Sequence, residues 1–149
     1  MKFISNSNDL SKFLKKPILK NIKIKTISTD TRSLKKDSLF IAIKGDTFNG
    51  NDYIAEAIKK GACLVITDSK KFKYSKNKKV IYVNDSILAL KKITKNIIKH
   101  YQGNVIGITG SNGKTTTTRI IANSIKNSSS TLKNFNNEIG MPLSIMNAD

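Results

Sequence analysis

The residues best suited to chemistry are two glycines followed at once by a lysine and by hydroxyl side chains. Gly110 and Gly113 are the first and last residues of a four-residue loop, and Lys114 follows the second glycine. Glycines allow backbone N–H groups to approach one anion closely, and a lysine adds a charge for β- and γ-phosphates. The hydroxyl of the next residue, Thr115, is able to bind magnesium. This spacing predicts a site for the phosphates of ATP, with Lys114 as the catalytic residue.

The segments beside this loop are those that a phosphate-binding loop requires. Residues 105–109 form a β-branched run typical of a strand, and residues 114–125 have the apolar spacing of a helix. A strand, a loop and a helix in this order bring backbone N–H groups and the positive end of a helix dipole to one point. The alternative is an ordinary turn that happens to precede a lysine. We expect the ATP phosphates to contact seven residues, Gly110, Ser111, Asn112, Gly113, Lys114, Thr115 and Thr116.

Strands and helices alternate through the first hundred residues. The expected strands are residues 22–25, 39–43, 63–67 and 80–83. The first expected helix is capped by Asn8 and runs through Leu14, the second extends from Asp52 to a cap at Gly61, and the third is capped by Ser86 and stops near residues 102–103. This alternation predicts an α/β fold with parallel strand pairing. We place a small N-terminal α/β domain at residues 1–85, and a connecting helix with the beginning of a parallel-sheet P-loop domain at residues 86–149.

The composition bounds the class of protein. The 149 residues carry 27 Lys+Arg against 10 Asp+Glu, a formal net charge of +17, and 38% of them are hydrophobic. That apolar content argues against a disordered tail, and no apolar stretch approaches the roughly 20 residues of a membrane-spanning helix. The start of the chain lacks the apolar segment of a secretory signal, and one cysteine cannot form an internal disulfide. We therefore expect a cytoplasmic protein.

The positive charge makes nucleic acid a candidate partner. A basic surface attracts polyanions at ordinary salt. The lysines are, however, scattered through every segment, only Arg32 and Arg119 are arginines, and no aromatic-rich RNA-binding signature is present. These features favour a solvated lysine-rich surface over dedicated nucleic-acid binding. A basic, non-catalytic binding module is the alternative to an enzyme.

Several motifs resemble those of the ATP-dependent Mur ligases of bacterial cell-wall synthesis. The phosphate loop of that family reads Thr-Gly-Thr/Ser-x-Gly-Lys-Thr/Ser. This pattern fits residues 109–115 and accounts for Ile108 at the place of the first glycine of the general P-loop pattern. Residues 28–32, 37–45, 48–50 and 53–54 look like the family's substrate-binding domain. Residues 134–142 resemble a segment of the branch that adds D-alanyl-D-alanine.

The resemblance implies an ATP-dependent amide-bond ligase of peptidoglycan precursor synthesis, with ATP and Mg²⁺ as cofactors. ATP would phosphorylate the terminal carboxylate of UDP-MurNAc-tripeptide, and the amine of D-Ala-D-Ala would attack the acyl phosphate. Residues 1–85 would then bind the UDP-sugar, and we expect a monomer. The resemblance places five residues at the substrate, Thr31, Asp46, Thr47, Asn136 and Asn137. For Asp30 and Arg32, substrate contact and turn stabilisation are both open.

The sequence also departs from the family in places. Members often have Asp-Gly-His where this chain has Asn49, Gly50 and Asn51. The diamino-acid-adding branch is the alternative within the family, although it usually has a threonine pair in place of Asn136 and Asn137. The resemblance covers about the first third of the family enzyme, so we expect a fragment that does not catalyse ligation alone. Residues after about 103 are expected to be marginally stable, because a small part of a parallel sheet leaves an apolar face uncovered.

Overall fold

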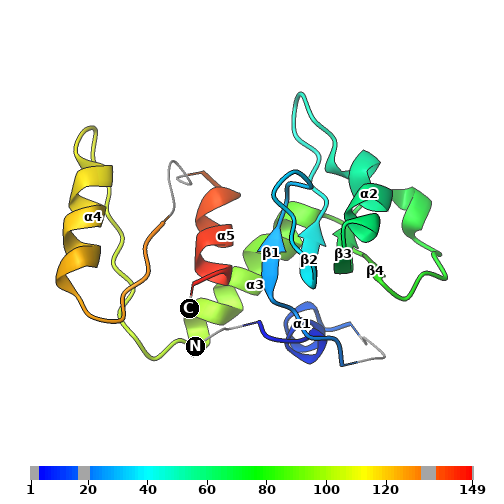
Figure 1. Ribbon diagram of the computed structural model, residues 1–149, viewed down its shortest axis with the longest axis horizontal. Helices are drawn as coiled ribbons and strands as arrows, with labels where there is room; N and C mark the ends of the chain where they lie inside the picture. Colours follow the sequence, from blue (N-terminus) through cyan, green and yellow to red (C-terminus); the bar gives the residue numbers. More distant parts are fainter. Residues whose placement is uncertain (1–3, 17–20, 132–136, 149) are drawn as a thin grey trace.

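The computed structural model describes residues 4–16, 21–131 and 137–148 of the chain (Figure 1). Its centre is a four-stranded sheet in the order β1-β2-β3-β4, and every neighbouring pair of strands is parallel. The strands are β1 (Thr26–Ser28), β2 (Ser38–Ile41), β3 (Ala62–Thr67) and β4 (Val80–Tyr82). The helices are α1 (Ser7–Leu14), η1 (Gly50–Tyr53), α2 (Ile54–Lys59), η2 (Lys70–Phe72), α3 (Ser86–His100), α4 (Lys114–Ser124) and α5 (Gly140–Met146). The predicted α/β class and parallel pairing are confirmed.

Helices cover both faces of the sheet because side chains alternate along each strand. Leu39 and Ile41 of β2 lie in a core that also holds side chains of α1, α3 and α5, whereas Phe40 lies in a second core with α2. All three side chains are completely buried. Burial on both faces is typical of a parallel sheet and explains why residues 39–43 form a continuous apolar run. None of the helices in the described ranges is long and apolar enough to cross a membrane.

Side-chain caps fix where two of the helices begin. The side chain of Asn6 accepts hydrogen bonds from the N–H groups of Asn8 and Asp9, and the Asp9 carboxylate accepts from the N–H of Asn6. These reciprocal bonds form a capping box, which joins the cap residue to the third residue of the helix. The cap is therefore Asn6, and the predicted cap at Asn8 is wrong. Asp85 rather than Ser86 caps α3, since its carboxylate accepts a backbone N–H three residues on at 2.8 Å.

The first predicted strand is displaced in the structure. Residues 22–25 contain only an isolated antiparallel bridge, between Asn6 and Lys23, and β1 begins at Thr26. The N–H of Ile24 donates to the carbonyl of Ser5 at 2.8 Å. The alternating pattern at 22–25 thus reflects pairing with the segment before α1. The main sheet starts at β1, which pairs with β2.

The strand predicted at residues 105–109 is not formed. This segment has no strand pairing, and the side chains of Val105 and Ile106 are 59% and 55% exposed. A parallel strand needs a neighbour to complete its backbone hydrogen bonds. None of the four described strands pairs with this segment. An apolar, β-branched run alone was therefore insufficient to form a strand.

Two helices that follow the boundary expected at Asp85 pack on the sheet that precedes it. α3 contributes Leu90 and Ile93 to the main core. α5 contributes Leu143 and Met146 to the same core. Figure 1 shows α5 beside α3, while α4 lies apart from the sheet on an extended connection. No residue of α4 is buried. The domain boundary itself stays a prediction.

Candidate functional site

Two glycines set the backbone of the predicted phosphate loop. Gly110 has φ +149° and Gly113 has φ +77°, both in the range that residues with a Cβ rarely adopt. A Cβ on Gly113 would meet no atom within 4 Å, so glycine is needed there for its conformation rather than for space. The positive φ of Gly113 turns the chain directly into α4, which begins at Lys114.

The start of α4 is suited to an anion. Gly113 precedes the helix and provides no side-chain acceptor for the N–H groups of the first turn. Such N–H groups and the helix dipole together favour a negative charge. Lys114 Nζ donates to the carbonyl of Gly110 and, at 3.3 Å, to that of Ser111, so the ammonium group lies against the loop. The ammonium group therefore lies against the loop that leads directly into the start of α4.

Thr115 is the predicted magnesium ligand on the same turn. Within the described residues, no three His, Cys, Asp or Glu side chains lie close enough together to hold a metal ion. Magnesium commonly takes one or two protein oxygens together with substrate phosphates and water. The exposed Thr115 hydroxyl fits this mode. Magnesium binding here would therefore depend on a bound nucleotide.

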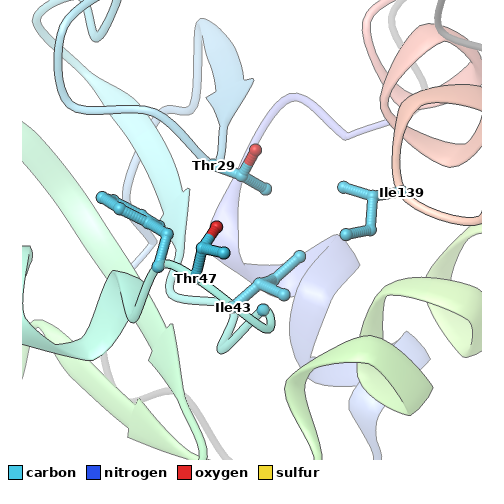
Figure 2. Close-up of a pocket in the computed structure, with 6 residues that line it drawn as sticks. Thr29, Ile43, Thr47 and Ile139 are labelled. Carbon is cyan, nitrogen blue, oxygen red and sulfur yellow. The ribbon is translucent and has the colours of Figure 1, made fainter.

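A pocket of about 170 Å³ lies at the carboxyl ends of β1 and β2 (Figure 2). We call it the strand-end pocket, and it is lined by Thr29, Ile43, Gly45, Thr47, Phe48 and Ile139. Figure 2 shows Ile139, which comes from the segment before α5, facing Thr29 and Ile43 across the opening. The carboxyl ends of parallel strands are where open α/β sheets bind ligands. The volume is below the roughly 300–1,000 Å³ of whole drug-sized sites, so the pocket would admit part of a larger ligand.

The loop after β2 forms one wall of the strand-end pocket and is held by backbone bonds. The N–H of Gly45 donates to Phe48 O at 2.7 Å, and the N–H of Gly50 donates to Ile43 O at 2.8 Å. A Cβ on Gly50 would lie 2.8 Å from the backbone N and O of Ile43, so only glycine fits. The ring of Phe48 stacks on that of Tyr53 with centroids 4.9 Å apart. This wall is thus fixed before any ligand binds.

The predicted substrate residues are divided between the pocket and other environments. Thr47 lines the strand-end pocket, whereas Asp46 is exposed and does not line it. Thr31 is 5% exposed, does not line the pocket, and accepts a hydrogen bond at its carbonyl from Lys60 Nζ at 3.0 Å. The sequence did not single out Thr29, although it belongs to the polar stretch after β1. Ligand contact by all of these residues stays a prediction.

Asp30 and Arg32 bind each other. The Arg32 guanidinium donates to both carboxylate oxygens of Asp30 at 2.7–3.0 Å, and the backbone N–H of Arg32 donates to the same carboxylate at 2.8 Å. These hydrogen bonds lower the pKa of Asp30 below its ordinary value. The structure therefore supports the turn-stabilising role for this pair.

Asn137 stabilises the start of α5. Its side-chain oxygen accepts from the N–H of Gly140 at 2.7 Å and from that of Ile139 at 3.2 Å. Asn136 lies outside the described residues. Asn137 therefore orients the segment that carries Ile139 to the strand-end pocket, and only its side-chain nitrogen is left for a ligand.

Asn51 joins three elements through a polar network. Its side chain donates to Asp68 at 3.1 Å and accepts from the Thr67 hydroxyl at 2.6 Å. Asp68 in turn accepts from the N–H of Ser86, the first residue of α3, at 3.2 Å. A neutral amide thus connects η1, the end of β3 and the start of α3.

The fold and these sites define an α/β protein with a glycine–lysine phosphate-loop motif at a helix start and a pocket at the ends of its parallel strands. The model of the Mur ligase family, catalytic domain, matches residues 23–126, and that of the Mur ligase middle domain matches residues 108–149. The first match covers well over half of the sequence. The chain belongs to the Mur ligase family.

Similar proteins from several bacteria are named as ligases of UDP-N-acetylmuramoyl peptides. The chain is 37% identical over 123 residues to the UDP-N-acetylmuramoyl-tripeptide–D-alanyl-D-alanine ligase of Bacillus subtilis (strain 168), a match that covers 80% of this chain and 27% of the relative. It is 40% identical over 105 residues to the UDP-N-acetylmuramoyl-L-alanyl-D-glutamate–2,6-diaminopimelate ligase of Rickettsia prowazekii (strain Madrid E), with 70% and 22% covered. The chain thus spans about a quarter of the length of these relatives.

Solved structures of similar proteins agree. The MurF ligase of Thermotoga maritima in complex with ADP matches with a TM-score of 0.68 and 34% identity, over 84% of this chain and 29% of that one. MurF from Acinetobacter baumannii matches with a TM-score of 0.74 and 25% identity, over 94% of this chain and 32% of that one. The match to the Acinetobacter baumannii protein covers nearly the whole chain. The similarity therefore extends through both the strand-end pocket and the phosphate loop.

Proposed function

We propose that this chain provides the UDP-sugar-binding part and the ATP phosphate loop of a cytoplasmic, monomeric ligase that adds D-Ala-D-Ala to UDP-MurNAc-tripeptide. The relative from Bacillus subtilis is named for that activity. The observation that carries the proposal is the loop before α4, where the Lys114 ammonium group lies against the carbonyl of Ser111 and no side chain caps the N–H groups of the first turn. The similar Thermotoga maritima protein was solved with ADP.

The reaction would proceed in two balanced steps. The γ-phosphoryl group of ATP passes to a carboxylate oxygen of the tripeptide, which gives ADP and an acyl phosphate. The amine then attacks the acyl carbon, phosphate leaves, and the nitrogen loses a proton to give the amide. Phosphoryl transfer depends on charge compensation and alignment. Lys114, with Mg²⁺ bound to the Thr115 hydroxyl and the phosphates, would compensate the charge, and the N–H groups of the loop would align the phosphates.

The strand-end pocket is the proposed site for part of the UDP-sugar. Thr29 and Thr47 offer hydroxyl groups, and Ile43 and Ile139 offer apolar surface on opposite sides. This mixture of a few polar groups in an apolar wall is typical of small-molecule sites. The 149-residue polypeptide would bind the UDP-sugar and ATP without forming the amide bond. It would therefore release no ADP when given ATP, UDP-MurNAc-tripeptide and D-Ala-D-Ala.

Calorimetric titration with ADP tests the phosphate loop. A charge-assisted hydrogen bond contributes about 1.5–3 kcal/mol, so Lys114→Ala should weaken ADP binding roughly 10- to 100-fold. Lys126→Ala is the matched control, because it removes the same charge from an exposed position beyond α4. Equal affinities for the Lys114→Ala and Lys126→Ala variants would contradict the proposal, and salt-dependent DNA binding that survives Lys114→Ala would favour the basic binding module instead.

Magnesium dependence tests the proposed metal ligand. Thr115→Ala should reduce the gain in ADP affinity that Mg²⁺ produces, because it removes the protein oxygen of the metal site. Thr117→Ala removes the same type of hydroxyl two residues later on an exposed part of α4 and should leave that gain unchanged. A Mg²⁺ effect that is the same in both variants would remove Thr115 from the site.

A second candidate within the family is ligation of a diamino acid, which the 40% identity to the Rickettsia prowazekii protein favours. The two relatives' printed names differ in the acceptor, which is a UDP-N-acetylmuramoyl-tripeptide in one and UDP-N-acetylmuramoyl-L-alanyl-D-glutamate in the other. Competition between these two ligands for the chain discriminates the candidates. Tighter binding of the tripeptide supports the proposed function, and tighter binding of the shorter peptide supports the alternative.

A further inference from the structure

The strand-end pocket is built from two parts of the chain that are far apart in sequence. Thr29, Ile43, Gly45, Thr47 and Phe48 belong to the loops after β1 and β2, whereas Ile139 precedes α5. The pocket therefore has its full shape only while α5 lies on the sheet. The affinity for a ligand that contacts both walls would therefore depend on the position of α5.

Apolar packing and one surface ion pair hold α5 in a general way. The side chains of Leu143 and Met146 are buried against α3 and the sheet. Lys91 of α3 donates to Glu138 at 2.6 Å, but both side chains are about half exposed. Exposed ion pairs contribute little, and apolar contacts permit small sliding movements. A directional contact is needed to fix α5 along β1.

Asn147, at the end of α5, makes that directional contact. Its side-chain oxygen accepts from the N–H of Ile27 at 2.9 Å, and its side-chain nitrogen donates to the carbonyl of the same residue at 2.9 Å. The nitrogen also donates to the carbonyl of Leu143 within α5 at 3.0 Å. β1 is the outer strand of the sheet. The carboxamide thus pairs with the open edge of β1 as a neighbouring strand would.

The two ends of α5 are consequently tied to the two walls of the pocket. Ile27, which Asn147 binds, lies two residues before Thr29 on one wall, and Ile139 at the other end of α5 forms the opposite wall. Building on the proposed function, we infer that Asn147 is a positioning residue that sets the separation of these walls and thereby the affinity for the UDP-sugar. A ligand that contacts both walls binds only the fraction of molecules in which α5 is docked.

The test uses the whole 149-residue chain and three variants. Asn147→Leu keeps a similar volume and removes both bonds to Ile27. Asn147→Asp keeps the acceptor for the Ile27 N–H and removes the donor. Ser144→Ala is the matched control, because the Ser144 hydroxyl donates only to Gly140 within α5 among the contacts seen there. Far-UV circular dichroism establishes that each variant is folded, and Asn147→Asp serves as the comparison if Asn147→Leu is not.

Three measurements separate positioning from general stability: hydrogen exchange of the Ile27 amide, binding of UDP-MurNAc-tripeptide, and binding of ADP. We expect Asn147→Leu to speed exchange at Ile27 and to weaken UDP-MurNAc-tripeptide binding roughly tenfold, with ADP affinity unchanged. Ser144→Ala should match the wild type in all three. A general loss of stability would instead speed exchange of the core amides of β3 together with that of Ile27.

The outcomes that overturn the inference are distinct from failure of the proposed function. Equal UDP-MurNAc-tripeptide affinity in the wild type and in Asn147→Leu would overturn the positioning role alone. Unchanged exchange at Ile27 would do the same. A wild-type chain that binds ADP but no UDP-MurNAc-tripeptide would overturn the proposed substrate and, with it, the role of Asn147 in its binding.

Discussion

Individual glycines of this chain are required for different physical reasons. At Gly113 the backbone has φ +77° and the space around a Cβ is empty, so the requirement is conformational. At Gly50 the space itself is missing, because a Cβ would lie 2.8 Å from the backbone of Ile43. The first glycine shapes the phosphate loop, and the second lets η1 start close against the end of β2.

The Gly50 contact leads to a prediction with a matched control in the same loop. Gly50→Ala should lower the free energy of unfolding by about 1–3 kcal/mol, because backbone atoms of Ile43 must move. Gly45→Ala places its Cβ 3.6 Å from Phe48 O, an ordinary contact, and should change stability far less. Urea unfolding of both variants measures the difference. Equal unfolding free energies would show that the loop adjusts freely.

The ion pair of Asp30 and Arg32 gives a pH-dependent prediction. The guanidinium lowers the pKa of Asp30 in the folded chain. The pair therefore contributes stability above the ordinary Asp pKa of about 3.9, and this contribution is lost as the pH falls through the lower folded value. Because the Arg32 side chain is 88% exposed, water screens the pair and this contribution is small.

A proton titration followed by NMR checks this pair directly. Arg32→Gln should raise the pKa of Asp30 toward its ordinary value. Lys25→Gln is the control, since it removes the partner that lowers the pKa of Asp37 and should leave Asp30 unchanged. An Asp30 pKa that does not respond to Arg32→Gln would mean that another group holds the carboxylate.

Residue spacing located the glycine loop before α4, whose phosphate binding stays a prediction, but it did not locate the strand-end pocket. Gly113 and Lys114 are adjacent in sequence, so their chemistry could be inferred without the fold. Thr29 and Ile139 are 110 residues apart and meet only because α5 packs beside β1. The resemblance singled out Thr47, whereas the other lining residues lie within the segments that carry the resemblance and were not named as site residues.

At the scale of elements, β2, β3 and β4 were predicted well, whereas β1 was displaced from its predicted position and the strand predicted at residues 105–109 did not form. β2 and β3 coincide with the apolar runs at residues 39–43 and 63–67. The run at residues 105–109 has the same character but no strand beside it. Apolar composition shows that a segment is able to enter a sheet, whereas strand formation also depends on a partner that supplies hydrogen bonds.

The start of α1 offers a test at this scale, because the sequence and the structure name different caps. Asn6→Ala removes the acceptor for two backbone N–H groups and should lower the free energy of unfolding by about 1 kcal/mol. Asn8→Ala changes an exposed residue of the first turn and should have little effect or a small stabilising one. Thermal or urea unfolding that finds the larger loss in Asn8→Ala would place the cap where the sequence suggested.

The whole molecule has an uneven distribution of packing. The sheet, α1, α3 and α5 share one buried core, while α4 has no buried residue although it carries the phosphate loop. An isolated helix shorter than about 12–15 residues is marginally stable in water. α4, with 11 residues, therefore depends on its own local interactions, whereas α5, with only 7, is held by the core. Marginal stability after residue 103 therefore stays a prediction for α4, whereas the burial of α5 in the core argues against it for that helix.

Hydrogen exchange resolved along the chain checks this difference. Amides of α4 should exchange far faster than those of β3, and amides of the shorter α5 should be better protected than those of α4, because packing outweighs helix length. ADP with Mg²⁺ should slow exchange chiefly in the first turn of α4, since the phosphates would occupy the N–H groups there. Protection in α4 as strong as in β3 without nucleotide would show that α4 packs on the core in solution. The phosphate loop would then be positioned by the sheet rather than ordered by the nucleotide that it binds.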